Sequence, residues 1–478
     1  MAGSMGHRER AREFVADVDR TRWHDQALWF VRSKRDQAAD LVPDWEALRD
    51  QASAIKRSAL TELPELWREF EEHATAAGTV VHWARDAHEH NEIVAGLLRD
   101  RSVRHVVKSK SMLTEECGLN SYLEAEGIEV IDTDLGERIV QLRGEPPSHI
   151  VMPAIHLQRA EIGELFAKEM GSAPDLDDPT ELTDVARRDL RDRFLKAEAG
   201  LTGINFAIAE TGGFVVVTNE GNADLGTALP GLHIASVGLE KIIPQQKDLA
   251  PFLRLLARSA TGQAITTYTS HFRGPRPRST QELHVVIVDN GRSQLLGRPA
   301  FREALGCIRC GACLNTCPVY RRSGGHSYSA TIPGPIGSVL ETSRDPATHA
   351  ELPHACSLCG SCTDVCPVRI PLHHQLLAWR GELALSGHHP AWRRFSLNLV
   401  AWLFVRPTMY RLLGRFARGI GRRLPPTLRE DLLPAWTRQR HLPTIPKSSF
   451  RELYRERQRQ PKRPRPQAQP RPRHERNG

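Results

Sequence analysis

The chain has 478 residues, of which 40% are hydrophobic and 26% charged, an ordinary balance for a globular protein of two or three domains. Its formal net charge of +8 is concentrated near the C-terminus. Residues 391–426 include eight arginines and no acid, and residues 451–478 include ten Lys or Arg against three Asp or Glu. The rest of the chain is therefore acidic overall, which excludes a basic nucleic-acid-binding body.

Membrane-spanning and secreted proteins are also disfavoured. No stretch approaches the roughly 18–20 apolar residues of a membrane span, and the N-terminus has no apolar signal region. We therefore expect a cytoplasmic protein, and a peripheral position at the inner membrane face remains compatible with the sequence.

Residues 1–75 are expected to form a helical segment, because Leu48, Ala52 and Ile55 recur at helical spacing. Over 76–295, short β-like runs alternate with helical patterns, which predicts an α/β domain with a parallel sheet. The β-like runs are 80–83, 105–108, 128–132, 149–152, 213–219, 233–237, 265–270 and 284–289, and the helical patterns are 86–99, 113–126 and 159–170.

Polar residues gather at the ends of the expected strands, where open α/β sheets bind ligands. Glu210, Thr211, Asn219 and Glu220 flank an apolar strand at 214–217. Lys108, Ser109 and Lys110 end another and are suited to a carboxylate or phosphate. The alternative is that these side chains cap helices and satisfy loop backbone. His82, His149 and His156 are expected to be ordinary core or loop histidines.

Eight of the nine cysteines lie between residues 307 and 366, in two runs of the form C-x2-C-x2-C-x3-C-P. Clustered cysteines in a cytoplasmic chain indicate metal before disulfides. Structural zinc sites usually use two separated C-x2-C pairs, so this pattern favours two [4Fe–4S] clusters. The ninth cysteine, Cys117, lies outside the set and is expected to be an inert, partly buried thiol.

In such paired runs three close thiolates bind one cluster, and the fourth, before a proline, serves the other. The first cluster is therefore assigned Cys307, Cys310, Cys313 and Cys366, and the second Cys317, Cys356, Cys359 and Cys362. Gly311 and Gly360 are expected to bring backbone N–H groups close to the cluster sulfides. The 38 residues between the runs favour a helical two-cluster domain, placed at 296–380, over a minimal ferredoxin.

Two further segments follow the cysteine runs. Residues 381–450 are expected to form an Arg-rich helical segment, whose aromatic and basic composition suits either an anionic lipid surface or a partner subunit. Residues 451–478 form a low-complexity basic tail that is expected to be disordered.

Several long motifs occur along the chain besides both cysteine runs, namely VKSKSMLTEE (107–116), IDTDLGE (131–137), PSHIVMPAIH (147–156), GINFAIAETG (203–212), VTNEGN (217–222) and GPIG (334–337). On these motifs and the cysteine runs, the sequence resembles the lactate-utilisation protein B family, iron–sulfur proteins of L-lactate oxidation, over nearly its whole length.

The resemblance implies a LUD domain, with a fold similar to the sugar-phosphate isomerase and CoA-transferase superfamily, and an α-helical ferredoxin domain. It also implies a non-catalytic, NAD-independent electron-transfer role in oxidising L-lactate to pyruvate. Partner subunits would oxidise lactate, and a membrane quinone or its reductase would accept the electrons. The sequence departs from the family pattern at Ile204, where a small residue is expected, and at Asp224, where an arginine is expected.

Two other functions fit the sequence. The LUD domain would act as an enzyme if its pocket bound lactate or an acyl or phosphate ester directly, with Glu220 a conceivable nucleophile by fold analogy. Alternatively, the clusters are mainly structural. No G-x-G-x-x-G follows a strand and no G-x4-G-K-[ST] is present, so no nucleotide-binding motif identifies a donor or an acceptor within the chain.

Overall fold

The computed structural model describes residues 6–276, 279–386, 391–425, 428–429, 431, 437 and 442–459. The chain divides into two units, residues 1–388 and residues 389–478, which are described separately. The boundaries expected near residues 75, 295 and 380 all fall within the first unit.

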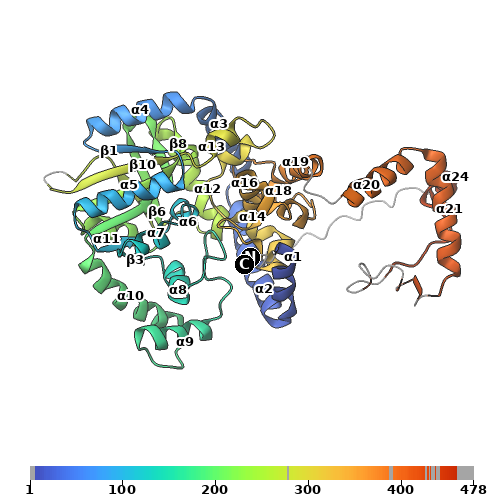
Figure 1. Ribbon diagram of the computed structural model, residues 1–478, viewed down its shortest axis with the longest axis horizontal. Coiled ribbons are helices and arrows are strands. Elements are labelled where there is room, and N and C mark those ends of the chain that lie inside the picture. Colours follow the sequence, from blue (N-terminus) through green and yellow to red (C-terminus); the bar gives the residue numbers. More distant parts are fainter. Residues whose placement is uncertain are drawn as a thin grey trace, which may run out of the picture. The chain divides into compact units, whose positions relative to one another are not determined.

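A six-stranded parallel sheet forms the centre of the α/β region of the first unit (Figure 1). Its strands lie in the order β1-β10-β7-β4-β2-β3, and every neighbouring pair is parallel. Strands β10 and β7 are buried almost throughout, as expected for apolar strands covered on both faces. The strands are β1 (Val80–Ala84), β2 (His105–Lys108), β3 (Glu129–Asp132), β4 (Ala199–Gly203), β7 (Leu232–Gly238) and β10 (Glu282–Val288).

Helices cover both faces of this sheet, and the alternation of side chains along β10 shows how. Val285 and Ile287 join the core beneath α4 (Leu63–Ala76), whereas Val286 and Val288 join the core beneath α5 and α7. The helices of this region are α5 (Ala87–Asp100), α6 (Met112–Glu116), α7 (Leu119–Ala125), α8 (Leu135–Arg143), α9 (Arg159–Met170), α10 (Pro179–Lys196), α11 (Asn222–Ala228), α12 (Leu249–Thr261) and α13 (Arg292–Leu296).

A smaller, mixed sheet has the strand order β8-β5-β6-β9. Its strands are β5 (Phe206–Ile208), β6 (Gly213–Thr218), β8 (Ile242–Ile243) and β9 (Tyr268–Phe272). Strands β5 and β6 are antiparallel and are joined through Gly212, which has φ +63°. A Cβ at Gly212 would lie 2.1 Å from the backbone nitrogen of Ala74, so glycine lets this turn approach helix α4.

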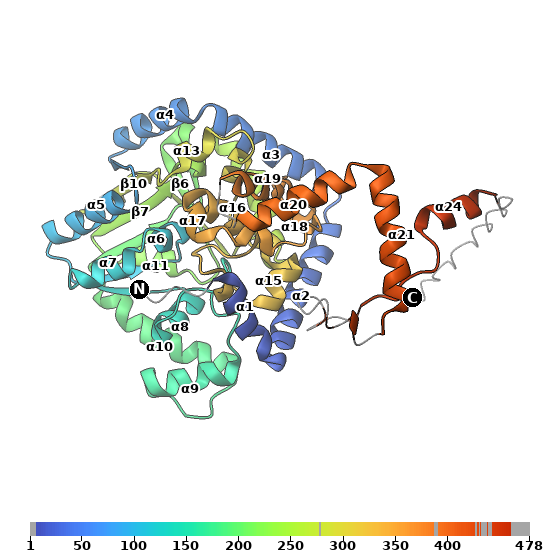
Figure 2. The same ribbon diagram turned by 45° about the vertical axis from the view of Figure 1, so that its right-hand side comes forward.

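The N-terminal helices join the α/β region to the cysteine segment. They are α1 (His7–Ala16), α2 (Val18–Asp40), α3 (Trp45–Thr61) and α4 (Leu63–Ala76). Helix α2 contacts α12 of the α/β region and also α14 and α15 of the cysteine segment. Figure 2 shows α15 beside α2. Residues of α2, α3 and α12 share one buried core with the cysteine segment.

Short helices make up the cysteine segment, as predicted. They are α14 (Ala312–Thr316), α15 (Pro318–Ser323), α16 (Gly334–Arg344), α17 (Pro346–His349), α18 (Ser361–Val365) and α19 (Leu372–Leu385). Pro318 is the first residue of α15, where its missing N–H costs no hydrogen bond.

The second unit contains α20 (Ala391–Phe404), α21 (Pro407–Arg423) and α24 (Phe450–Arg459). Along α21 the apolar side chains recur on one face and four arginines on the other. The apolar positions are Met409, Leu412, Leu413, Phe416 and Ile420, and the arginines are Arg411, Arg415, Arg418 and Arg422. Among the described helices, none is both long and apolar enough to cross a membrane.

Two expectations about local structure were wrong. Residues 149–152 form a bend rather than a strand, because the His149 imidazole accepts hydrogen bonds from the backbone N–H groups of Val151 and Met152. Residues 450–459, assigned mostly to the disordered tail, form α24. Ser449 and Glu452 cap its start reciprocally, a capping box that the sequence analysis overlooked. Residues 460–478 lie outside the described residues.

Candidate iron–sulfur site and adjoining cavity

The two cysteine runs have the same local conformation. Arg309 and Leu358 have φ of +60° and +55°, and Gly311 and Gly360 have φ of +75° and +81°. A short helix follows each glycine. Alternating left-handed residues turn backbone N–H groups toward a common centre, which suits an anionic cluster.

Backbone N–H groups already point at several of the sulfurs. Cys307 Sγ accepts a hydrogen bond from the N–H two residues later at 3.3 Å, and Cys356 Sγ accepts the equivalent bond at the same distance. Cys366 Sγ accepts from the N–H of Ile370 at 3.4 Å. Hydrogen bonds of this kind stabilise thiolates bound to iron.

The thiols gather in two neighbouring groups that draw on both runs. Burial raises the pKa of Cys310, and the nearby thiols of Cys366 and Cys307 raise it further. Cys362 behaves in the same way, with Cys317 among its thiol neighbours and a pKa of about 12. These neighbours are compatible with the two groups predicted from the spacing, with Cys307, Cys310, Cys313 and Cys366 as the first group and Cys317, Cys356, Cys359 and Cys362 as the second.

This donor set fits [4Fe–4S] clusters. Burial and mutual repulsion raise the pKa of both Cys317 and Cys366 to about 11, so these thiols hold protons in the metal-free chain. Iron would displace the protons and neutralise the crowded thiolates. Each group supplies four sulfurs, the number that a cubane requires.

The two groups differ in exposure. Cys310, Cys313 and Cys366 of the first group are buried, whereas Cys359 of the second group is exposed. Burial also raises the pKa of Cys313, and both groups contribute neighbouring thiols to this effect, so the groups lie close together. The second group is therefore the one that another protein reaches more directly.

A cavity of about 350 Å³ adjoins the first group. Its walls come from the carboxyl ends of β2, β4, β6 and β7 and from Ile308, Arg309 and Cys310. Ligands bind at this edge of open α/β sheets. The cavity therefore connects the ligand-binding edge of the sheet with the first cysteine run.

Some of the polar residues predicted at strand ends line this cavity, and others do not. Asn219, Glu220 and Lys110 line it. Lys108 is fully buried and forms ion pairs with Glu115 and Asp132, so its charge is already neutralised.

Of the remaining predicted polar residues, Ser109 is buried away from the cavity wall and its hydroxyl has no hydrogen-bond partner among the described residues, whereas Glu210 and Thr211 have local partners. Glu210 accepts a hydrogen bond from the N–H of Gln246, and Thr211 accepts one from the N–H of Gly213. Asp224, which stands where the family pattern has arginine, pairs with Ser270 and is absent from the cavity wall.

Comparison with known proteins assigns the same segments. Residues 67–294 match the LUD domain, residues 303–370 the 4Fe–4S dicluster domain, and residues 382–459 the C-terminal domain of lactate utilisation protein B. Lactate utilization protein B of Oceanobacillus iheyensis is 39% identical over 95% of this chain and 97% of its own length. The chain belongs to the lactate utilisation protein B family.

Another relative agrees with this assignment. Lactate utilization protein B of an Exiguobacterium species (strain AT1b) is 41% identical over 89% of this chain and 92% of its own length. A crystal structure of a DUF162 family protein from Deinococcus radiodurans matches 47% of this chain and 98% of its own length, with 16% identity and a TM-score of 0.27.

In this member of the lactate utilisation protein B family, arginines of the N-terminal helices reach the cysteine segment, which the sequence analysis missed. Arg49 donates hydrogen bonds to the carbonyl of Cys366 at 2.9 and 3.2 Å. Arg35 donates to the carbonyl of Val365 at 3.2 Å. Both arginines are buried, although they lie more than 300 residues from these partners. Nothing in the local sequence signals such contacts.

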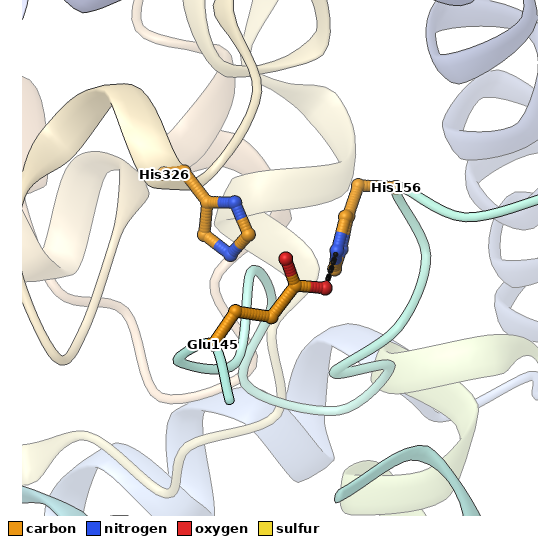
Figure 3. Close-up of side chains that lie close together, drawn as sticks. All are labelled: Glu145, His156 and His326. Atoms are coloured by element: carbon orange, nitrogen blue, oxygen red, sulfur yellow. Dashed lines mark hydrogen bonds and ion pairs between the residues drawn. The ribbon is translucent and has the colours of Figure 1, made fainter. Parts of the chain in front are cut away.

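A second cluster of metal-binding residue types joins the LUD domain to the cysteine segment. Glu145, His156 and His326 bring three potential ligand atoms within 4.8 Å of one another (Figure 3). Hydrogen bonds account for them: Glu145 Oε1 lies 2.8 Å from both His156 Nε2 and Arg143 Nε, and His326 donates to the carbonyl of Pro146 at 2.8 Å. We infer that this cluster stabilises the contact between the LUD domain and the cysteine segment.

In this member of the lactate utilisation protein B family, the ninth cysteine and two of the histidines considered above have structural roles. Cys117 is buried, and its burial raises its pKa to about 12, as expected of an inert thiol. His149 is buried and donates from Nε2 to Asn315 at 3.0 Å. His82 stacks on His284 with 3.0 Å between ring nitrogens.

Proposed function

We propose that this chain is the iron–sulfur electron-transfer subunit of a system that oxidises L-lactate to pyruvate. Membership of the lactate utilisation protein B family supports a role in lactate oxidation. The grouping of eight thiols across the two cysteine runs supports a role in electron transfer. The second observation carries the proposal, because clusters with exchanged ligands lie close enough for electrons to pass between them.

Lactate oxidation releases two electrons and two protons, whereas each cluster carries one electron at a time. A partner subunit would therefore oxidise lactate and deliver electrons singly. The proposed ligands are Cys307, Cys310, Cys313 and Cys366 for the first cluster and Cys317, Cys356, Cys359 and Cys362 for the second.

Anaerobic reconstitution tests the cofactor. We expect about eight iron atoms per chain and an EPR signal on reduction. Cys366→Ser should perturb the same cluster signal as Cys310→Ser, and Cys317→Ser the other one, while Cys117→Ser should leave the iron content unchanged. A colourless, zinc-loaded protein would refute the cofactor. Pairing of Cys366→Ser with Cys362→Ser would refute the exchanged ligands.

The native complex tests the electron-transfer role. Purified with its partner subunits, it should show cluster reduction that depends on added L-lactate. Clusters that cannot be reduced and reoxidised without unfolding the protein would instead indicate a structural role.

We also propose that the second unit holds the protein at an anionic membrane face, where a quinone or its reductase would accept electrons. The observation that favours this position is α21, which has exposed apolar residues on one face and arginines on the other, with no acid between residues 391 and 426.

A further inference from the structure

The cavity beside the first cysteine group has the size and position of a ligand site. Its volume of about 350 Å³ lies within the range of small-molecule pockets. That space holds roughly ten water molecules, which suits a small organic acid better than a nucleotide cofactor. Because Arg309 and Cys310 form part of the wall, a bound molecule would lie next to the first cluster.

Basic residues lie where the cavity meets the cysteine run. Arg309 Nη2 is 3.5 Å from Glu240, whose other oxygen accepts a 2.5 Å bond from Arg292. Lys241 Nζ makes a long bond of 3.4 Å to the carbonyl of Cys307. Arg309 therefore pairs with Glu240 through Nη2 only, at a long distance, and its Nη1 has no hydrogen-bond partner among the described residues, so Arg309 and Lys241 both have capacity to bind an anion.

Two polar atoms of cavity-lining residues have no hydrogen-bond partner within the described part of the chain. They are Arg309 Nη1 and Thr218 Oγ1, and both are buried atoms. Leaving a buried donor unsatisfied costs free energy, so such atoms mark places where a ligand supplies the missing partner.

A second group of polar residues lines the cavity around Glu220. The Glu220 carboxylate accepts a hydrogen bond from the N–H of Leu135 at 3.1 Å. Burial and the nearby Asp134 carboxylate raise the pKa of Glu220 to about 7, and Lys110 opposes that rise. Lys110 Nζ donates one bond, to the carbonyl of Val151 at 2.8 Å, and has two further donors. These residues suit a hydroxyl or carbonyl group.

We propose that this cavity binds a small 2-hydroxy or 2-oxo monocarboxylate, and that the first cluster senses its binding. Arg309 and Lys241 receive the carboxylate, and Thr218, Lys110 and Glu220 contact the oxygen at C2. The choice of acid rests on the proposed function, whereas the cavity and its basic residues do not. No oxidation step is assigned to the cavity.

The test uses the full-length, anaerobically reconstituted protein with L-lactate, pyruvate, propionate and inorganic phosphate as probes. Calorimetry should show lactate or pyruvate binding at least about tenfold more tightly than propionate, which lacks the C2 oxygen. The same acid should change the EPR signal of the reduced first cluster. Absence of binding, or equally tight binding of propionate or phosphate, would overturn the proposal.

Variants locate the site. Thr218→Val and Lys110→Met should each weaken acid binding at least about fivefold at unchanged iron content, since the first removes a hydroxyl and the second an ammonium group from the cavity wall. Lys168→Met, which changes an exposed lysine of α9 outside the cavity, and Thr183→Val on the surface of α10 should bind as the natural protein does. Unchanged binding in both cavity variants would refute the site.

The cavity proposal and the proposed electron-transfer function can be refuted independently. A complex whose clusters are reduced by lactate, although the isolated subunit binds no acid, retains the proposed function and loses this inference. If the subunit binds the acid but its clusters cannot be reduced in the complex, this inference is retained and the proposed function is refuted.

Discussion

A fully buried lysine ends strand β2. Lys108 has no exposed surface, and its ammonium lies 2.7 Å from carboxylate oxygens of both Glu115 and Asp132. Burial alone would lower its pKa, but the two carboxylates outweigh this effect and raise the pKa well above 10.5. Lys108 therefore stays charged and is committed to the fold rather than to a ligand.

Removing this charge should be costly. Lys108→Met leaves two carboxylates in the interior without their cation, so we expect the free energy of unfolding to fall by about 3–5 kcal/mol. Urea denaturation of the full chain measures the change. The control is Lys168→Met, whose side chain is 79% exposed and which should change stability by less than about 0.5 kcal/mol. Equal losses in both variants would contradict the role of the ion pairs.

His233 makes stability depend on pH. It is buried, its Nε2 lies 2.8 Å from Thr202 Oγ1, and burial lowers its pKa from 6.5 to about 3. The His233 imidazole therefore binds a proton near pH 6.5 in the unfolded chain but stays neutral at this pH in the folded chain. The stability that His233 contributes is present above pH 6.5 and is lost as the pH falls toward 3.

The size of this effect follows from the pKa difference. Between pH 7.5 and 5.5 the loss is about 1.4 kcal/mol for one histidine. Urea unfolding at the two pH values should therefore show a decline that is smaller by about this amount in His233→Gln than in the natural protein. Parallel declines would show that His233 is not the group responsible.

Residue spacing leads to a prediction of the cysteine grouping, because the geometry of a cubane constrains which thiols share it. It did not distinguish Lys108 from Lys110. The two lysines are two residues apart, yet the first points into a carboxylate cage and the second lines the cavity. The path of the backbone at the end of β2 and in the following loop decides that difference, and the sequence pattern around the two lysines does not predict it.

At the scale of elements, helix α3 links the LUD domain to the first cysteine group. Arg49 on this helix is buried and donates to the carbonyl of Cys366. Its positive charge favours the more negative, reduced form of a nearby cluster. Arg49→Gln should therefore make the reduction potential of the first cluster more negative, by roughly 40 mV for each kcal/mol of lost interaction.

A redox titration followed by EPR measures this shift. Arg57→Gln is the matched control, because Arg57 lies on the same helix and its side chain is 62% exposed. The control should leave the potential unchanged. The same potential in Arg49→Gln as in the natural protein would contradict the electrostatic role of α3.

Elements were predicted best where periodicity was strong. The runs at 105–108 and 159–170 coincide with β2 and α9. The run at 149–152 has strand-like composition, but the His149 side chain takes the N–H groups that a ladder would need. Strand β4 (Ala199–Gly203) was missed because its alanine and two glycines have low strand propensity, and parallel neighbours on both sides hold it in place.

At the scale of the whole molecule, the pairings that build the LUD domain join distant parts of the chain. Strand β1 pairs with β10, about 200 residues later, and α2 contacts both the α/β region and the cysteine segment. Alternating patterns predicted a parallel sheet but not this order. The cavity arises from that order, because it places the ends of β2, β4 and β7 against the first cysteine run.

The second unit leads to a prediction for the intact protein. Phe416 and Leu412 on the apolar face of α21 are 68% and 63% exposed within that unit, and Arg411, Arg415, Arg418 and Arg422 lie along the other face. Such a helix binds at a lipid surface with its apolar side inserted and its arginines at the headgroups. We expect the reconstituted protein to float with phosphatidylcholine vesicles only when they contain phosphatidylglycerol, and less so at high salt.

Changing the four arginines on the basic face of α21 (Arg411, Arg415, Arg418 and Arg422) to glutamine should weaken vesicle binding by about 1 kcal/mol for each arginine near the surface. The control changes four arginines of the first unit that have the same total charge, namely Arg85, Arg187, Arg188 and Arg191, and should leave flotation intact. If both sets weaken binding equally, net charge rather than the α21 face is responsible. If neither vesicle binds the natural protein but a purified partner subunit does, the amphipathic face serves protein assembly and the membrane position is wrong.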